Sequence, residues 1–204
     1  MTDDLAQLRR RNLRTLGLLA GLFLLPLVAA FLLYYGSSWR PATRVNHGRL
    51  FSPPQALPSP SLPQVAGMPS PPGVRPAPPL RGTWSLVYVG GGACDAECRA
   101  TLTVMRQARL ALGTDMTRVA RVFLATRECC DRDYLGREHP GLTVLDASGP
   151  AALPLLGAFP AAGLAHTVFV VDPLGNLVLG YDAREDPHGL LADLKKLLRL
   201  SQIG

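Results

Sequence analysis

Two cysteines separated by three residues are the part of this sequence whose types and spacing most directly suggest chemistry. Cys94 and Cys98 follow an apolar stretch and three glycines, Gly90 to Gly92. Apolar residues then recur with helical periodicity as far as Leu112, with arginines between them. We therefore expect a helix that begins near Cys94 and carries both thiols on one turn.

This spacing allows several kinds of chemistry. Residues four apart on a helix lie on the same face, with Cβ atoms about 5–6 Å apart, so the two sulfurs can converge on one ion. A helix N-terminus favours the thiolate, which attacks disulfides and binds soft metals such as Cu(I) and zinc. A disulfide needs Cβ atoms about 3.5–4.5 Å apart, so it would require some adjustment of the first turn. Two buried apolar cysteines, or a purely structural disulfide, are the alternatives.

The sequence around the cysteines predicts alternating strands and helices. A buried strand is expected directly before the glycines, at Trp84–Val89, because its residues are apolar, β-branched or aromatic. The remaining predicted elements are, in order, a strand at Val119–Ala125, a polar connection containing Cys129 and Cys130, a strand at Leu142–Leu145, a short helix at Ala151–Phe159, a hairpin of the strands Thr167–Val171 and Leu177–Tyr181, and a helix at Pro187–Leu200. The hairpin turn contains a proline and a glycine that suit a turn with a bulge.

This order of elements resembles that of a thioredoxin-like domain, an α/β fold, which would occupy residues 81–204. In a chain of 204 residues, one domain with appendages is the reasonable expectation. Right-handed crossovers would make the first two strands parallel neighbours. The cysteine pair would then lie at the carboxyl end of a strand, where α/β sheets place their ligands.

The N-terminal part of the chain predicts a membrane anchor. Residues 15–35 form an uncharged apolar run of about twenty residues, long enough to cross the hydrocarbon core. The arginines just before this run, Arg9 to Arg11 and Arg14, place residues 1–14 in the cytoplasm and the domain on the other side. A cleaved signal peptide is the alternative, but its apolar region would be only about 7–15 residues long. We therefore expect a single transmembrane helix that is retained.

Residues 36–80 are expected to form a juxtamembrane segment and a linker. From Ser52 to Leu80 the composition shifts to proline, serine and small residues, which cannot form a packed core. Such a segment is typical of an extended, semi-rigid spacer of the polyproline type. It would hold the domain at a distance from the bilayer.

The combination of a basic start, one anchor, a linker and a thioredoxin-like domain with this cysteine motif resembles the Sco/SenC family, the copper-binding assembly factors of cytochrome c oxidase. The resemblance extends to four further segments, namely Asn46-His47-Gly48, Met105-Arg106, Val171–Asn176 and Asp193–Leu198. These segments are most similar to a bacterial branch of transmembrane, cytochrome oxidase-associated proteins. The resemblance implies a single-pass protein of a bacterial inner membrane, with its N-terminus in the cytoplasm and its C-terminal domain in the periplasm.

The same resemblance implies a copper site. Its ligands would be Cys94, Cys98 and His166, because the family holds copper with two cysteines and one histidine that precedes the late hairpin. Two thiolates and a neutral imidazole would suit three-coordinate Cu(I), and a four-coordinate Cu(II) site would need an added ligand. On its own terms, a lone histidine such as His166 is more often a structural residue than a ligand.

Two functions of different classes follow. The first is a metallochaperone, a carrier rather than an enzyme, that delivers copper to a cytochrome c oxidase subunit or another copper protein. The second is a thiol-disulfide oxidoreductase that reduces the cysteines of an oxidase copper site or of another carrier, with Cys94 as the nucleophile and Cys98 as the resolving thiol. Either would depend on a periplasmic thiol reductant. A third reading is an assembly scaffold without copper chemistry.

Other polar residues are open to plainer readings. Cys129 and Cys130 are either a second thiol pair that exchanges disulfides with the first, or loop residues that are cross-linked to each other. We expect His139 and His188 to be ordinary exposed side chains, and His47 to be interfacial or to contact a partner. The net charge of +6 gives a basic surface, and no nucleic-acid motif accompanies it.

Overall fold

The computed structural model describes residues 2–36, 46–65, 80–127, 129–185, 187–201 and 203, and the chain divides into two compact units at residues 1–45 and 46–204. The described part of the first unit is one helix, α1 (Thr2–Gly36). Its part from Arg9 to Gly36 is long and apolar enough to cross a membrane, and its side chains there are exposed. The expected anchor at residues 15–35 lies inside this helix, which also extends back through most of the expected cytoplasmic segment.

The second unit is built on one mixed sheet of six strands. In chain order they are β1 (Arg49–Ala56), β2 (Trp84–Gly90), β3 (Val119–Ala125), β4 (Leu142–Asp146), β5 (Thr167–Val171) and β6 (Asn176–Asp182). Their order across the sheet is β1-β6-β5-β2-β3-β4. The strands β2, β3 and β4 are parallel, as expected for the first two, whereas β5, β6 and β1 pair antiparallel. The β5–β6 hairpin carries the expected register shift, between Val170 and Val171.

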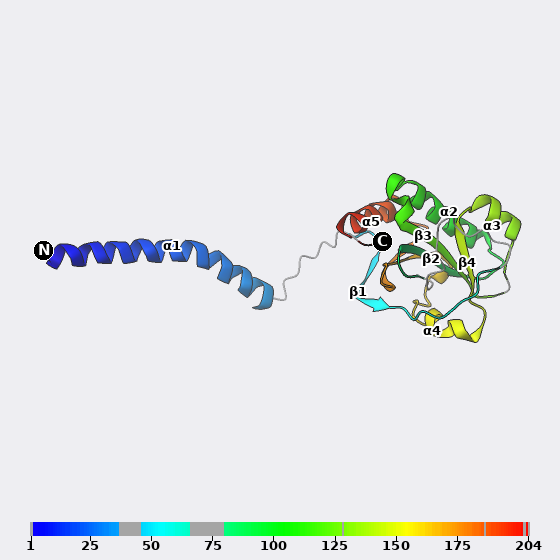
Figure 1. Cartoon of the computed structure of the whole chain (residues 1–204), viewed down its shortest axis with the longest axis horizontal. Coiled ribbons are helices and arrows are strands. Elements are labelled where there is room, and N and C mark those ends of the chain that lie inside the picture. Colours follow the sequence, from blue (N-terminus) through cyan, green and yellow to red (C-terminus); the bar gives the residue numbers. More distant parts are fainter. Residues whose placement is uncertain are drawn as a thin grey trace. The chain divides into compact units, whose positions relative to one another are not determined.

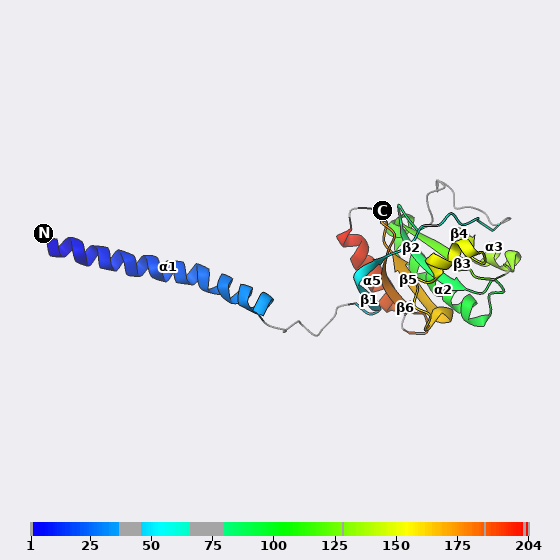
Figure 2. The same ribbon diagram turned by 90° about the horizontal axis from the view of Figure 1, so that it is seen from below.

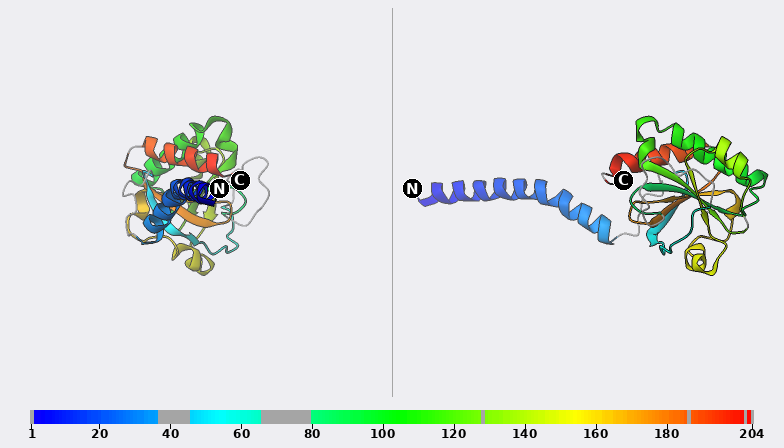
Figure 3. Two further views of the ribbon diagram at one scale, coloured as in Figure 1. Left: turned by 90° about the vertical axis from the view of Figure 1, so that its left-hand side faces the viewer. Right: turned by 45° about the vertical axis from the view of Figure 1, so that its right-hand side comes forward.

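Helices cover both faces of this sheet. They are α2 (Ala96–Leu110), η1 (Gly113–Arg118), α3 (Arg132–Glu138), η2 (Pro150–Ala152), α4 (Leu153–Leu156), η3 (Leu164–His166) and α5 (Pro187–Leu200). The long helices α2 and α5 lie on one face with α3, and α4 lies on the other (Figures 1 and 2). Figure 3 shows the same layers from the side, with the sheet between them.

The two faces of the central strands pack into two separate apolar clusters. On β2, Leu86 and Tyr88 join the cluster under α2 and α5, whereas Val87 and Val89 join the cluster on the α4 side. This alternation follows from the two-residue period of side chains along a strand. A strand that is buried on both faces must be apolar at nearly every position, which is why β2 could be predicted.

Strand β1 corrects the expected domain boundary. Residues 36–80 were expected to form a linker, but β1 pairs with β6 and belongs to the compact unit that begins at Asn46. The prolines Pro53 and Pro54 are tolerated because β1 is an exposed edge strand, where a missing N–H breaks no inner ladder. The remainder of the expected spacer, residues 66–79, lies outside the described residues.

The chain after β1 continues to the opposite edge of the sheet. The amide of Val65 donates to the carbonyl of Val144 at 3.0 Å, and the amide of Asp146 donates to the carbonyl of Pro63 at 2.9 Å. Residues 46–65 therefore contact both outer parts of the sheet, β6 on one side and β4 on the other.

Two helical regions also differ from the expectation. The helix α3, which Asp131 caps by accepting from the Tyr134 amide at 3.0 Å, was missed and lies in the expected polar connection. The expected helix at Ala151–Phe159 is shorter, because it consists of the 3-10 turn η2 followed by the single turn α4.

Candidate functional site

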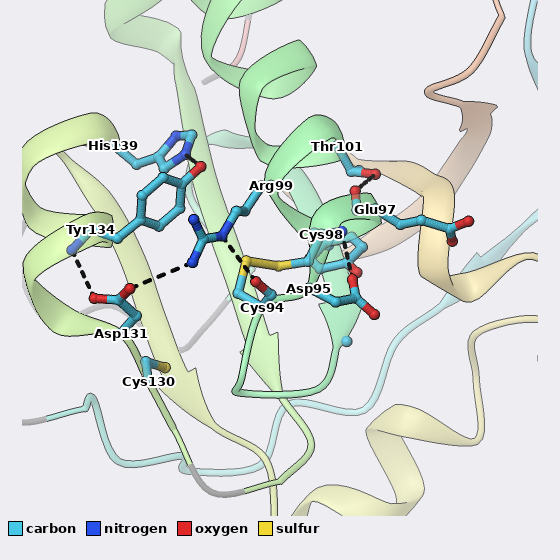
Figure 4. Close-up of a disulfide and its surroundings, with 12 residues drawn as sticks. Cys94, Asp95, Glu97, Cys98, Arg99, Thr101, Cys130, Asp131, Tyr134 and His139 are labelled. Atoms are coloured by element: carbon cyan, nitrogen blue, oxygen red, sulfur yellow. Dashed lines mark hydrogen bonds and ion pairs between the residues drawn. A yellow bond between two sulfur atoms is a disulfide. The ribbon is translucent and has the colours of Figure 1, made fainter.

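The candidate site centres on a disulfide between Cys94 and Cys98, with a sulfur–sulfur distance of 1.99 Å and Cα atoms 5.0 Å apart (Figure 4). The expectation that both residues lie on the helix was wrong for Cys94, because α2 begins at Ala96. The physical reason is Asp95, an N-cap residue whose side chain accepts a hydrogen bond from the Cys98 amide at 3.0 Å. Cys94 is thus free to leave helical geometry and approach Cys98.

The loop before the disulfide has an unusual backbone. Cys94 has a φ of 44°, in the left-handed region that residues other than glycine rarely adopt. Its amide donates to the carbonyl of Gly91 at 3.2 Å, which closes the turn that leaves β2. At Gly90 a side chain is excluded, because its Cβ would lie 2.6 Å from the Tyr88 hydroxyl. Gly90 therefore allows the Tyr88 side chain to pack closely against this loop.

A cavity of about 730 Å³ adjoins the disulfide. Its walls come from three parts of the chain, namely Tyr88 to Asp95 with Cys98, then Thr126 and Arg127, and finally Leu164 and Ala165. The cysteines themselves are almost completely buried, with 2% of Cys94 and 1% of Cys98 exposed. The disulfide is therefore part of the core, beside a cavity that is open to a ligand or a partner's side chain.

Tyr88 connects the cysteine loop to the segment that carries His166. Its hydroxyl donates a hydrogen bond to the carbonyl of Ala165 at 3.1 Å. Burial, and after it the negative charges of Asp95 and Glu97, raise the pKa of Tyr88 to about 12. The phenol is therefore neutral and remains a hydrogen-bond donor at physiological pH.

His166 ends the 3-10 turn η3, directly before β5, and lies between two carboxylates. Its Nδ1 is 3.7 Å from a carboxylate oxygen of Glu97, and its Nε2 is 3.6 Å from one of Asp182. The side chain is 19% exposed, and Nδ1 is buried without a hydrogen bond. Since Glu97 stands between the two cysteines on the first turn of α2, the third expected site residue lies against the turn that carries Cys98.

Cys94, Cys98 and His166 could hold copper only after the disulfide between the two cysteines has been reduced. Two thiolates and an imidazole suit Cu(I), but sulfurs that are joined in a disulfide are not thiolate ligands. Within the described residues, no group of three or more His, Cys, Asp or Glu side chains is arranged to hold a metal ion. The structure therefore describes the oxidised form of the pair.

Arg99, the residue after Cys98, is a site component that the sequence reasoning missed. Its Nε donates to the carbonyl of Cys94 at 3.2 Å, and one of its Nη atoms lies 3.5 Å from the carboxylate of Asp131. Its guanidinium also lies over the ring of Tyr134, 4.3 Å from the ring centre (Figure 4). Arg99 thus links the cysteine loop to the start of α3. Its position next to Cys98 was the one available signal.

The other two cysteines lie in the connection between β3 and α3. Cys129 and Cys130 are joined to each other, which leaves no free cysteine in the chain. Both are partly buried and pack against the apolar cluster that contains Cys94 and Cys98. The two cysteine pairs therefore border the same core.

A buried histidine and arginine lie beyond Tyr134. His139 was expected to be exposed, but this was wrong, because only 1% of it is accessible and its Nε2 lies 3.2 Å from the Tyr134 hydroxyl. Burial, and after it the charges of Arg121 and Arg106, lower the pKa of His139 to about 4. Burial, and after it the charges of Arg109 and Arg106, lower the pKa of Arg121 to about 10. The histidine is therefore neutral near pH 7. His188 is exposed on the first turn of α5, as expected.

The segment Asn46-His47-Gly48 contacts the last helix. Asp193 of α5, a carboxylate that is only 5% exposed, accepts hydrogen bonds from the amides of His47 and Gly48. The His47 ring is also within 3.3 Å of this carboxylate, while most of that ring remains exposed. The segment is therefore held by the domain at the point where the described chain resumes after α1.

Comparisons with known proteins agree with this architecture. A sequence model of the family described as transmembrane-like, thioredoxin-like, C-terminal domain matches residues 84–201, from β2 to just beyond α5. The comparison with curated proteins finds no match.

Among solved structures, the chain is similar to apo Sco1 from Thermus thermophilus, with 23% identity, a TM-score of 0.53, and coverage of 76% of this chain and 99% of that chain. It is also similar to yeast Sco1 with copper bound, with 16% identity, a TM-score of 0.52, and coverage of 59% and 80%. At these identities the likeness establishes the fold.

Proposed function

The chain belongs to the family described as transmembrane-like, thioredoxin-like, C-terminal domain, and from that premise we propose that it is a membrane-anchored copper metallochaperone of the Sco type. Its ligands would be the sulfurs of Cys94 and Cys98 and a ring nitrogen of His166. The copper-bound yeast Sco1, which shares the fold, makes copper the metal to test. The recipient would be a cytochrome c oxidase subunit or another copper protein.

One observation carries this proposal. The short turn that ends in His166 lies against the first turn of α2, because Glu97, between the cysteines, is 3.7 Å from the His166 Nδ1. These residues are distant in sequence, yet the fold places the imidazole beside the turn that carries Cys98. A soft two-sulfur, one-nitrogen donor set is typical of Cu(I) rather than of a hard cation.

The disulfide sets an order of events in the proposed function. The Cys94–Cys98 bond must be reduced before the sulfurs can bind copper, because the thiolate is the metal ligand. The Asp95 cap keeps the Cys98 amide paired and so holds the first turn of α2 in place. His166 would then exchange its carboxylate neighbours for the metal. Cu(II) would need a further ligand.

The location follows from the anchor and the arginines before it. The helix α1, with the arginines near residue 10 preceding its apolar part, would place the N-terminus in the cytoplasm and the domain in the periplasm of a bacterial inner membrane. In that compartment disulfides form and persist, so a thiol reductant is needed to keep the site reduced.

The test is a Cu(I) titration of the full chain in detergent, after complete reduction, against a chromogenic chelator. We expect one Cu(I) per chain, with affinity weakened by at least about 100-fold in Cys94→Ser or Cys98→Ser, since losing a metal ligand removes a major part of the binding free energy. His166→Ala should weaken it less, and His188→Ala, an exposed histidine, is the matched control. Equal affinity in the wild type and both cysteine variants would refute the copper proposal.

A second function, thiol-disulfide oxidoreductase, is favoured by the disulfide itself. In this role Cys94 would attack a partner's disulfide, Cys98 would resolve the mixed disulfide, and His166 would be dispensable. The His166→Ala variant distinguishes the two functions. A chaperone loses copper affinity in His166→Ala, whereas an oxidoreductase keeps its exchange rate with a disulfide substrate in the same variant.

A further inference from the structure

We propose that Cys129 and Cys130 form a second redox pair that exchanges a disulfide with Cys94 and Cys98, so that external thiols react at the outer pair and the inner pair binds the metal. The exchange itself depends only on the two cysteine pairs. Its purpose, to make the inner thiolates available for copper, rests on the proposed function.

The difference in burial between the two pairs is the first support. Cys94 and Cys98 are 2% and 1% exposed, so a folded reductant reaches their bond only by inserting its own cysteine into the cavity that they line. Cys129 and Cys130 are partly exposed. Because disulfide exchange requires direct attack by a thiolate on a sulfur, access decides which pair a protein reductant meets first.

The connection that carries the outer pair also borders the inner pair. Thr126 and Arg127, at the start of this connection, form a wall of the same cavity that Cys94 and Cys98 line. The outer cysteines pack against the cluster that contains the inner ones. The cavity thus lies between the inner disulfide and the segment that leads to Cys129.

Arg99 holds the two segments together at a second point. Its guanidinium contacts the Cys94 carbonyl on one side and Asp131, the residue after Cys130, on the other. Figure 4 shows Arg99 between the disulfide and the Asp131 carboxylate, with the Cys130 side chain directly below Asp131. Of the two outer cysteines, Cys130 is the one directly next to this contact in the chain, so we assign to it the attack on Cys94.

The exchange balances in two steps. With the outer pair reduced, the Cys130 thiolate attacks the Cys94 sulfur, so that the Cys94–Cys98 bond breaks, the Cys94–Cys130 bond forms, and Cys98 leaves as a thiolate. The Cys129 thiolate then attacks Cys130, which forms the Cys129–Cys130 bond and releases Cys94 as a thiolate. Two electrons pass from the outer to the inner pair, and the thiol protons of the outer pair pass to solvent. An external dithiol protein of the thioredoxin class reduces Cys129–Cys130 again by the same chemistry.

Copper would set the direction of this exchange. In a chain that holds one disulfide and two thiols, the disulfide can occupy either pair. Cu(I) binds only the form with free Cys94 and Cys98, so by mass action it moves the disulfide to Cys129–Cys130. The occupied carrier would then hold its outer pair oxidised.

Trapping the mixed disulfide is the first test. In the full chain in detergent, Cys98→Ser with Cys129→Ser leaves only Cys94 and Cys130, and a glutathione redox buffer should cross-link them within the monomer. The matched variant, Cys94→Ser with Cys130→Ser, leaves Cys98 and Cys129 and should cross-link far less. Peptide mapping by mass spectrometry measures the yield of the cross-link in each variant. Absence of the Cys94–Cys130 link, or equal yields in the two variants, overturns the proposal.

The second test separates the exchange from the copper site. In Cys129→Ser with Cys130→Ser, reduction of Cys94–Cys98 by thioredoxin should slow by about tenfold or more, whereas reduction by a small phosphine should not change, since a small reagent is less limited by access. After phosphine reduction this variant should still bind one Cu(I). An unchanged thioredoxin rate overturns the exchange and leaves the copper proposal standing. If the reduced wild type does not bind Cu(I), the copper proposal is refuted, but the proposed disulfide exchange is not.

Discussion

One carboxylate oxygen of Asp193 accepts hydrogen bonds from the backbone amides of both His47, at 2.8 Å, and Gly48, at 3.0 Å. The contact joins the beginning of the domain to its last helix, and its carboxylate is buried. At Gly189 of α5 a Cβ would lie 2.8 Å from the His47 Cβ, so the two segments pack without space for a further methyl group. The segment around His47 is thus a structural part of the domain.

Replacing Asp193 tests this contact. Asp193→Ala leaves two backbone amides without their acceptor, and we expect it to lower the free energy of unfolding by about 1 to 3 kcal/mol. Asp193→Asn keeps an acceptor oxygen and should cost less. Urea unfolding of residues 46–204 measures both, and Glu185→Ala, at an exposed position, is the control. An Asp193→Ala variant as stable as the control would show that the contact contributes nothing.

Removing β1 should weaken the whole domain. A chain that begins at residue 81 loses the strand that pairs with β6 and the segment that contacts β4, and so exposes the backbone of β6. We expect it to unfold at lower urea concentration than a chain that begins at Asn46, and to self-associate. Size-exclusion chromatography and urea titration compare them directly. Equal midpoints and monomeric behaviour in both would contradict the assignment of β1 to the domain.

The N-cap of α2 should matter for the disulfide as well as for the helix. Asp95→Ala removes the acceptor of the Cys98 amide and should destabilise the oxidised domain by about 0.5 to 2 kcal/mol. Asp95→Asn is the matched control, because asparagine caps helices comparably well. We also expect faster phosphine reduction of Cys94–Cys98 in the alanine variant alone. Identical rates in all three proteins would show that the cap does not hold this turn.

His139 should make the domain less stable in weak acid. Its pKa falls from 6.5 to about 4 in the folded state, so between these pH values the unfolded chain binds more protons than the folded one. Stability should therefore fall as the pH drops from about 6.5 to about 4, by about 3 kcal/mol in all. If the urea midpoint is plotted against pH, the His139→Gln variant should show a smaller decrease between pH 6.5 and pH 4. The His188→Gln variant should show the same decrease as the wild type.

A second acid-sensitive group acts in a different pH range. Asp182 has its pKa lowered to about 2, chiefly by the hydrogen bond from Arg184. A lowered carboxylate pKa stabilises the fold above its unfolded value, near 4, and this contribution is lost as the pH falls towards 2. The slope above pH 4 therefore reports His139, and a profile that is unchanged there in His139→Gln would contradict its burial as a neutral group.

The oxidised protein should not bind copper at the candidate site. With Cys94 and Cys98 joined, His166 is the one remaining expected donor, so Cu(I) affinity should fall by several orders of magnitude relative to the reduced chain. Chelator competition on air-oxidised and phosphine-reduced samples measures the ratio. Comparable affinities in the two states would mean that copper binds elsewhere in the chain.

Much of the sheet could be predicted because its strands have strong local patterns. The apolar run at Val119–Ala125 predicts a buried strand, and the turn residues around Asp172 predict a hairpin. The structure contains both elements at these residues. Strand β1 could not be predicted, because Pro53 and Pro54 are typical of a linker and become compatible with a strand only at an edge. Whether an edge is available depends on β6, which lies far along the chain.

The candidate site could likewise be predicted only in part. The spacing of Cys94 and Cys98 predicted a possible disulfide with an adjusted first turn, and the Asp95 cap explains how the adjustment occurs. The neighbours of His166 could not be predicted, because they come from separate elements, α2 and the end of β6. The burial of His139 likewise depends on tertiary packing that no local pattern encodes.

The contact between Asp193 and His47 also determines how mechanical load enters the domain. A pull on the chain that precedes Asn46 acts first on this contact and on the pairing of β1 with β6. Strand β5 lies between these elements and β2, which leads into the Cys94 loop. Strand β6, which pairs with β1, ends in Asp182, whose carboxylate lies 3.6 Å from the His166 Nε2, so the strand that receives the pull also contacts an expected copper ligand.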